Sequence, residues 1–279
     1  MVTSHRLPDK TFMIIQHRMF SISLIIFVAI LAGNVFAQTP EAAQREPLRI
    51  IDMPTAGINH RGEFNTDLRV YPDGGVLANM GIGLFRRMMF GLSYGGTNVV
   101  GRGKIDGNKL PGLLVKYRLW EETVPLPAFA LGYDNQGTGR WSDSLNRYEY
   151  KAPGLFIAAS KNFKLGDDKN FGLHAVISWN SAETKDDRGV TGSLGTDISL
   201  NEELVAVGEY NMALDDNKKN VYGQYATLGK GKGYFNVGLR WAISKIYLQF
   251  ELKDILGNRV NTSSPDRSVS ISFADNIKW

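Results

Sequence analysis

Apolar and polar residues alternate with a period of two along most of the chain after residue 62. The alternation is clearest at the end, where apolar side chains take odd positions, interrupted only by Asp275, and Ser268, Ser270, Ser272, Asn276 and Lys278 take even ones. The apolar positions there are Val269, Ile271, Phe273, Ile277 and Trp279. A period of two predicts a β-strand. One apolar face and one Ser-rich face are typical of a membrane β-barrel, whose outer surface meets lipid and whose lumen is polar.

The same pattern predicts eleven further strands between residues 63 and 254. Their approximate spans are 63–70, 76–84, 88–95, 113–120, 129–134, 154–163, 173–180, 190–198, 204–211, 235–241 and 246–253. In the fourth of these, Val115 and Tyr117 are expected to face lipid, and Lys116, Arg118 and Trp120 to face the lumen. The span 154–163 is the weakest, because Leu155-Phe156-Ile157 is apolar on both faces.

Turn signals support a barrel over a soluble β-sandwich, which is the alternative. Short turns at 85–87, 121–126, 164–170, 201–203 and 243–245 alternate with connections that are mostly long: 96–110, 135–149, 181–189, 213–233 and 255–266. Such asymmetry between two rims is typical of transmembrane barrels, and an even strand number places both termini on the periplasmic side. We therefore predict an all-β, antiparallel, up-and-down transmembrane barrel of twelve strands over 63–279. The loop 213–233 could contain a hairpin at 221–228.

The amino terminus has the pattern of a secretory signal peptide. Basic residues precede an apolar run from Ile22 to Leu31. The cleavage site predicted after this run is Val35-Phe36-Ala37, which ends on a small residue. We expect residues 1–37 to be cleaved, with Met1, Met13 or Met19 as the start. An uncleaved helical anchor is the alternative, although the run is shorter than the roughly 20 residues that a spanning helix needs. Residues 38–62 are then a periplasmic lead or a small plug segment.

Composition narrows the function classes. There is no cysteine, so a lipid-modified cysteine anchor and disulfides are excluded. Loss of residues 1–37 removes Arg6, Lys10, Arg18 and Asp9, which lowers the formal charge from +4 to +2. Charges of both signs are interspersed, so nothing predicts binding to nucleic acid. We expect neither a metal nor a cofactor.

Several motifs resemble the YjbH-like outer-membrane proteins, a barrel family with some members in gene clusters for exopolysaccharide production. The motifs are Met53-Pro54-Thr55-Ala56-Gly57, Leu68-Arg69-Val70-Tyr71-Pro72-Asp73-Gly74-Gly75, Gly91-Leu92-Ser93-Tyr94-Gly95-Gly96, Val115-Lys116-Tyr117-Arg118, Ser199-Leu200-Asn201-Glu202-Glu203-Leu204 with Glu209-Tyr210-Asn211, and Gly238-Leu239-Arg240-Trp241. The resemblance spans roughly residues 52–279. It implies an outer-membrane barrel with no catalytic residues to carry over.

His174, Ser178 and Asn180 are the most enzyme-like trio in the sequence, because all three share one face of a predicted strand. Residues four apart on a strand are about 13 Å apart, which is too far for a Ser–His hydrogen bond. A polar lumen residue is therefore the preferred interpretation of His174.

Nine charged residues are expected to point into the lumen. They are Glu63, Asp67, Arg69, Lys116, Arg118, Glu209, Arg240, Glu251 and Lys253. Two interpretations stay open: the charges pair across strands and fill a narrow barrel, or they line a water-filled channel.

At the carboxyl terminus, three apolar residues are expected to form the signal that the barrel-assembly machinery recognises. They are Phe273, Ile277 and Trp279.

The leading hypothesis is a non-enzymatic outer-membrane barrel that assists export or surface assembly of an exopolysaccharide or other envelope polysaccharide. Its expected partners are outer-membrane lipid, the barrel-assembly machinery and polysaccharide export components. A small passive channel is the alternative, and a lipid-modifying enzyme is a further one.

Overall fold

The computed structural model of the protein describes residues 45–165, 169–183, 188–219, 222, 227–260, 262 and 265–277. The predicted signal peptide, residues 38–44 and Trp279 lie outside the described residues, as does most of the hairpin expected at 221–228. No helix among the described residues is long and apolar enough to cross a membrane.

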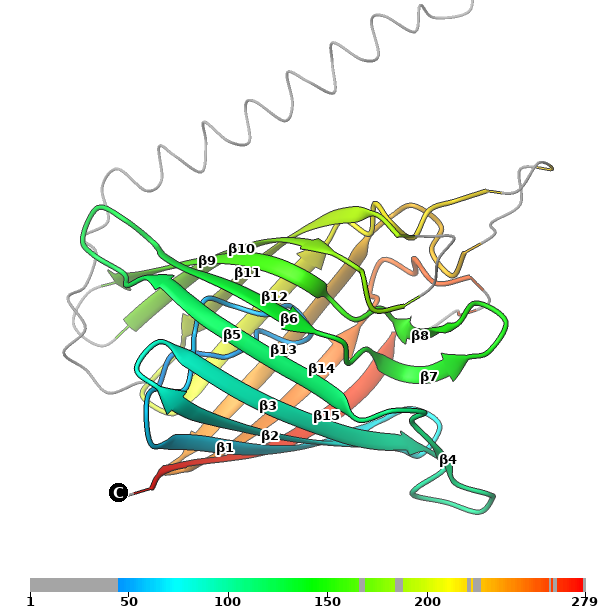
Figure 1. The fold of residues 1–279 in the computed structure, drawn as a ribbon, viewed down its shortest axis with the longest axis horizontal. Helices are drawn as coiled ribbons and strands as arrows, with labels where there is room; N and C mark the ends of the chain where they lie inside the picture. Colours follow the sequence, from blue (N-terminus) through cyan, green and yellow to red (C-terminus); the bar gives the residue numbers. More distant parts are fainter. Residues whose placement is uncertain are drawn as a thin grey trace, which may run out of the picture. The chain divides into compact units, whose positions relative to one another are not determined.

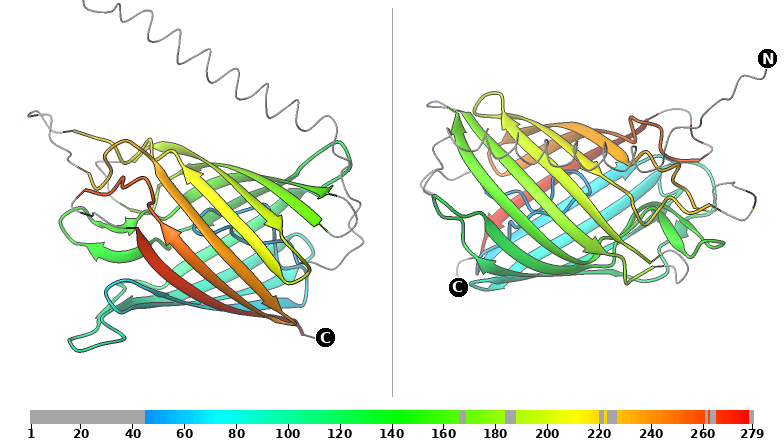
Figure 2. Two further views of the ribbon diagram at one scale, coloured as in Figure 1. Left: turned by 180° about the vertical axis from the view of Figure 1, so that it is seen from behind. Right: turned by 90° about the horizontal axis from the view of Figure 1, so that it is seen from above.

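Twelve antiparallel strands form one closed barrel (Figures 1 and 2). Each strand pairs with its neighbours in chain order, and β1 pairs with both β2 and β15, which closes the ring. The strands are β1 (Glu63–Tyr71), β2 (Gly75–Phe85), β3 (Met88–Thr97), β5 (Gly112–Trp120), β6 (Ala128–Asp134), β9 (Gly154–Leu165), β10 (Lys169–Trp179), β11 (Val190–Ser199), β12 (Leu204–Asn211), β13 (Tyr234–Ile243), β14 (Ile246–Lys253) and β15 (Asp266–Asn276). The predicted up-and-down barrel of twelve strands is confirmed.

The outer surface of the barrel is apolar. Leu92 and Ile177 are 61% and 65% exposed, and similar side chains follow the outward positions of the other strands. Exposed aromatic residues lie near both barrel ends, among them Trp120 and Trp241 at one end and Tyr94 and Trp179 at the other. An apolar band between aromatic residues is the surface that a bilayer requires.

One orientation prediction is wrong. Trp120 was expected in the lumen but is 63% exposed on the outside, where its ring meets Phe129 edge-on at 6.0 Å. The reason is a β-bulge, since the register between β5 and β6 shifts between Arg118 and Trp120. An extra residue in one strand reverses the side to which later side chains point.

The two barrel ends differ. The terminal rim, where β1 begins and β15 ends, carries the short connections β2–β3, β9–β10, β11–β12 and β13–β14 and the somewhat longer β5–β6. The opposite end, here the loop rim, carries the long connections, as Figure 1 shows. Two of these contain elements that the alternation did not predict: β4 (Asp106–Gly107), which pairs with β3, and a hairpin of β7 (Thr138–Ser142) and β8 (Arg147–Tyr150).

The β7–β8 hairpin and its neighbours form a cap at the loop rim. Arg147 and Asp216 are both almost fully buried and form an ion pair of 2.5 Å, and the Tyr234 hydroxyl donates to Asp216 at 2.6 Å. The rings of Tyr150 and Tyr234 meet at 5.4 Å. The cap thus joins the β6–β9 connection to the β12–β13 connection and to the barrel wall.

Glu183 attaches a third connection to the cap. Its carboxylate accepts hydrogen bonds from the backbone N–H groups of Tyr148 and Ala152 and from the Asn180 amide, at 3.2, 3.1 and 2.8 Å. Burial raises the pKa of Glu183 to about 7 in spite of these donors.

Candidate functional site

Residues 47–58 form a hairpin inside the barrel, seen as the blue segment within the strands in Figures 1 and 2. We call it the lumen hairpin. Its two arms pair through Thr55 N–H to Leu48 O at 3.2 Å and Ile50 N–H to Met53 O at 3.0 Å. The chain enters and leaves at the terminal rim, because Arg45 donates to the carbonyls of Phe64 and Asp275 and Gly62 pairs with Gly83.

The hairpin tip rests on one carboxylate. Oε2 of Glu209, on β12, accepts the backbone N–H groups of Ile51, Asp52 and Met53 at 2.9, 3.0 and 2.9 Å. The other oxygen accepts the Asn236 amide at 2.8 Å. Three consecutive backbone donors converging on one buried carboxylate form a strong anchor, because hydrogen bonds to charged groups are stronger than neutral ones.

The two arms of the hairpin meet one ammonium group on the other side of the barrel. Nζ of Lys116, on β5, donates to the carbonyls of Leu48, Thr55 and Gly57 at 2.6, 3.1 and 3.0 Å. All three donor hydrogens of this buried lysine are therefore used. Strands on opposite walls thus hold the hairpin by its backbone.

Asp52 carries the only charged side chain at the tip, and two barrel cations meet it. Arg69 pairs with Asp52 at 2.6 Å and Lys253 pairs with it at 2.5 Å. Arg69 also donates to the Ile51 carbonyl at 2.7 Å and contacts Glu251 at 3.3 Å. Burial of this charge is compensated by the two cations.

The other predicted lumen charges are mostly near the hairpin as well. Arg240 donates to the carbonyls of residues 49 and 50, and Arg118 pairs with Glu46 and with Glu121. Glu63 accepts the N–H of His60 at 2.8 Å, next to the end of the hairpin. Asp67 instead accepts hydrogen bonds from two barrel residues, Asn79 and Ser272.

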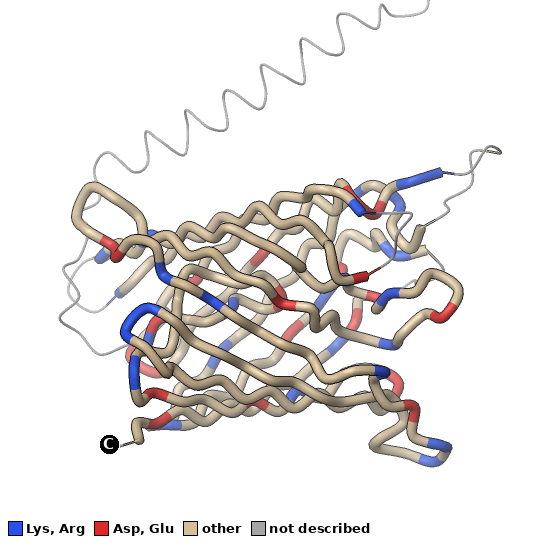
Figure 3. The backbone as a smooth tube through the Cα atoms, in the orientation of Figure 1, with Lys and Arg blue, Asp and Glu red and all other residues tan. Residues whose placement is uncertain are grey.

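Of the nine residues, only Arg69 and Glu251 form an ion pair with each other in the described part of the chain. Five of the nine bond directly to hairpin residues: Arg69, Lys116, Glu209, Arg240 and Lys253. The expected pairing of charges across strands therefore describes this lumen less well than pairing with the hairpin does. Figure 3 shows that charged residues also gather at the two barrel ends.

The hairpin also packs through apolar contacts. Ile50, Ile51, Met53 and Ala56 form one buried cluster with inward residues of β6, β9, β10 and β12, which are Ala128, Ala130, Phe156, Ala158, Val176 and Val207. Part of the lumen is therefore apolar, whereas the strand pattern led us to expect a polar one. The apolar run Leu155-Phe156-Ile157 was the sequence signal for an apolar patch in the lumen, because Phe156 faces the hairpin while its two neighbours face lipid.

Two glycines on the inner wall make room for the hairpin and for the two residues that follow it. A Cβ on Gly195, which lies opposite Glu209, would come within 2.5 Å of the end of the Met53 side chain and 3.1 Å of Ile50. A Cβ on Gly83 would come within 2.0 Å of the His60 carbonyl oxygen. At position 83 only glycine permits so close an approach to a backbone carbonyl, and at position 195 glycine leaves the Met53 side chain in its place.

His174 does not contact Ser178 and Asn180 as a catalytic trio. Its Nδ1 lies 2.8 Å from Ser160 Oγ on β9, and its Nε2 lies 2.6 Å from Asp197 on β11. These distances resemble a Ser–His–Asp relay. However, Ser160 Oγ is buried and accepts the N–H of Ala56, in the second arm of the hairpin, at 2.9 Å. The hydrogen-bonded series Asp197–His174–Ser160 therefore holds this arm to the barrel wall.

No group of three or more His, Cys, Asp or Glu residues that could hold a metal occurs in the described part of the chain.

No protein-family model matches the sequence, and no curated protein matches it significantly. Solved structures of similar fold include a KdgM porin, 10% identical over 76% of this chain and 98% of that one, with a TM-score of 0.45. A NanC porin is 12% identical over 78% and 99%, with a TM-score of 0.41. The Acinetobacter baumannii outer membrane protein Omp33 is 8% identical over 77% and 98%, with a TM-score of 0.40.

The architecture and the outer surface together define the class of protein. A closed barrel of twelve antiparallel strands with an outward apolar band is a transmembrane barrel of the outer-membrane type. The terminal rim then corresponds to the periplasmic side and the loop rim to the extracellular side.

Proposed function

We propose that this protein is a non-enzymatic outer-membrane channel for small polar solutes, held closed by the lumen hairpin. The observation that carries the proposal is the way in which the tip is held, by Glu209 on three backbone N–H groups. The barrel residues that form hydrogen bonds and ion pairs with the hairpin are polar and can be solvated by water once it leaves. The hairpin is continuous with residues at the periplasmic rim, so it can withdraw toward the periplasm.

Buried charges also argue for a closing role rather than a purely structural one. Apolar residues of similar volume would fill a narrow barrel at least as stably as charged ones do. Charges that alternate between the hairpin and water, by contrast, line a passage when the hairpin is out. The lumen-facing charges behind the hairpin would therefore line a channel once the hairpin has left.

A bulky substitution in the barrel wall tests the proposal. Gly195→Leu places a side chain where Met53 and Ile50 now lie, and should displace the tip. Gly208→Leu is the matched control, because a Cβ there finds no atom closer than 3.8 Å. We expect Gly195→Leu barrels in planar bilayers to conduct at least tenfold more often than the parent and the control barrels. Equal conductance of all three, with normal folding, would refute the closing role.

We propose in addition that residues 1–37 are a cleaved signal peptide, and that Phe273, Ile277 and Trp279 guide assembly of the barrel. The mass of the mature protein checks the first point. Substitution of Phe273 and Trp279 by Ala checks the second, since it should lower the amount of folded barrel in the outer membrane without changing its synthesis.

A second proposal is assistance in the export or surface assembly of an envelope polysaccharide. The observation that favours it is that Met53-Pro54-Thr55-Ala56-Gly57, one of the motifs that resemble YjbH-like proteins, forms the tip and the second arm of the hairpin. Deletion of the gene should then change the amount or the chain length of surface polysaccharide. An unchanged amount and chain length of surface polysaccharide would refute this second proposal and leave the channel proposal unaffected.

A further inference from the structure

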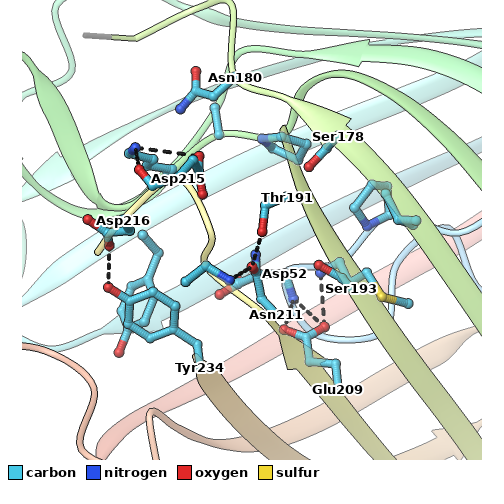
Figure 4. Close-up of a pocket in the computed structure, with 18 of the residues that line it drawn as sticks. Asp52, Ser178, Asn180, Thr191, Ser193, Glu209, Asn211, Asp215, Asp216 and Tyr234 are labelled. Carbon is cyan, nitrogen blue, oxygen red and sulfur yellow. Dashed lines mark hydrogen bonds and ion pairs between the residues drawn. The ribbon is translucent and has the colours of Figure 1, made fainter. Parts of the chain in front are cut away.

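A cavity lies between the hairpin tip, the barrel wall and the cap (Figure 4). It offers about 60 Å³ of space open to water. Its floor is Asp52, Met53 and Pro54, its wall comes from β10 to β13, and its roof comes from residues 147–153 and 213–216. At about 10–15 Å³ for each water, it has room for a few waters or for one edge of a sugar ring, but not for an oligosaccharide.

The charged groups around the cavity are already compensated by the protein. Asp216 pairs with Arg147 at 2.5 Å, and Asp215 pairs with Lys151 at 3.4 Å. Glu209 accepts the tip amides and the Asn236 amide, and the charge of Asp52 is paired with Arg69 and Lys253. A charged solute would therefore find no uncompensated partner and would lose its hydration on entry.

The polar groups left over are neutral. In the described part of the chain, Ser178 Oγ, Ser193 Oγ and the Asn211 amide nitrogen all belong to residues that line the cavity and have no hydrogen-bond partner. Ser193 lies directly opposite Asn211 in the β11–β12 register and opposite Val176 in the β10–β11 register. Two hydroxyls and one amide thus line one wall of the cavity, as Figure 4 shows for the labelled side chains.

Apolar and aromatic surface completes the lining. Val176, Met53 and Ala213 present C–H groups, and the paired rings of Tyr150 and Tyr234 border the roof. Hydroxyl and amide partners on one side and C–H or aromatic surface on the other match a molecule that bears hydroxyls on an aliphatic ring or chain.

We propose that this cavity binds a small neutral polyol or one edge of a neutral sugar residue. The bound molecule exchanges hydrogen bonds with Ser178, Ser193 and Asn211 and rests on Met53 and Pro54 at the hairpin tip. The site goes beyond channel function and does not depend on it, because it is formed with the hairpin in place.

Ligand-observed NMR of the refolded full-length barrel tests this proposal, in a detergent without a sugar headgroup. The probes are glycerol, glucose, galactose, mannose and N-acetylglucosamine, with glucuronate and glucosamine as charged analogues. We expect saturable binding of at least one neutral probe, and binding of the charged analogues at least tenfold weaker. No saturable binding of any neutral probe, or tighter binding of a charged one, would overturn the proposal.

Substitutions locate the site. Ser193→Val should weaken binding roughly tenfold, the effect of one lost hydrogen bond, and Ser178→Val should do the same. Ser199→Val is the matched control, because Ser199 lies on the same strand, is buried, and does not line the cavity. Wild-type affinity in both cavity variants would overturn the assignment, provided that they fold as the control does. Conductance plays no part in this test, so its failure is distinct from failure of the channel proposal.

Discussion

Glu209 holds the hairpin tip through both of its oxygens. Oε2 accepts all three tip amides, and Oε1 accepts the Asn236 amide and a second contact from the Asp52 N–H. In Glu209→Gln, either orientation of the new amide directs an NH₂ group at one of these donors. Loss of a hydrogen bond to a charged group costs about 1.5–3 kcal/mol. We expect the hairpin to leave the lumen more often, with at least a tenfold rise in channel openings in planar bilayers.

Glu202→Gln is the control for that variant, because Glu202 is an exposed glutamate in the β11–β12 turn. It removes the same charge without touching the hairpin. If Glu209→Gln and Glu202→Gln have the same opening frequency, Glu209 does not hold the hairpin in the lumen.

Substitution of Lys116, on the opposite wall of the barrel, should also release the hairpin. Lys116→Met keeps the length of the side chain but leaves three backbone carbonyls of the hairpin without their shared donor. We expect trypsin to cleave after Arg49 at least tenfold faster than in the parent protein, since release of the hairpin exposes this bond. Lys104→Met, in an exposed loop, should cleave at the parent rate. Slow cleavage in both variants would show that Lys116 is dispensable for the hairpin.

At the scale of elements, the cap should respond to pH through Glu183. Its pKa is about 7 in the folded protein and about 4.5 when it is exposed, so folding takes up a proton between these values. The stability of the cap is therefore greatest below pH 4.5 and falls as the pH rises toward 7. We expect the free energy of local opening at the Tyr148 and Ala152 amides, measured by hydrogen exchange, to be lower at pH 8 than at pH 5.

Glu183→Gln should remove most of that pH dependence, because the amide does not titrate. Glu202→Gln should retain it. A parent protein whose opening free energy at these two amides is the same at pH 5 and pH 8 would contradict this account of the cap.

Strands could be predicted from the sequence because each alternates over a long enough stretch to fix its faces. Trp120 was placed wrongly because a β-bulge is a property of two strands and leaves no trace in the alternation of one. β7 and β8 were missed because they are short and lie in a segment rich in turn residues.

The lumen hairpin could be predicted only in outline. Its Pro and Gly residues indicated an irregular segment, but Ile50 and Ile51 are too few to show a periodicity. Their partners come from distant strands, such as Phe156 on β9 and Val207 on β12. The relay from Asp197 through His174 to Ser160 likewise joins three strands, and so depends on a register that the sequence alone does not reveal.

For the whole molecule, the central claim is that residues 47–58 close a barrel that is otherwise a channel. The walls around the hairpin carry charges that bond to it, and they have glycine at position 195 beside the hairpin and at position 83 beside residues 59 and 60. A barrel that never opens would also need these glycines. The charges are the feature expected of a barrel that exchanges the hairpin for water, because apolar residues would fill a permanently closed lumen at least as stably.

The most direct measurement is the single-channel conductance of a barrel in which residues 47–58 are replaced by a short Gly-Ser linker. We predict a stable open conductance in planar bilayers for this variant, with folding checked by heat-modifiable migration on gels, and rare brief openings for the parent protein. A folded variant that conducts no better than the parent would contradict the account.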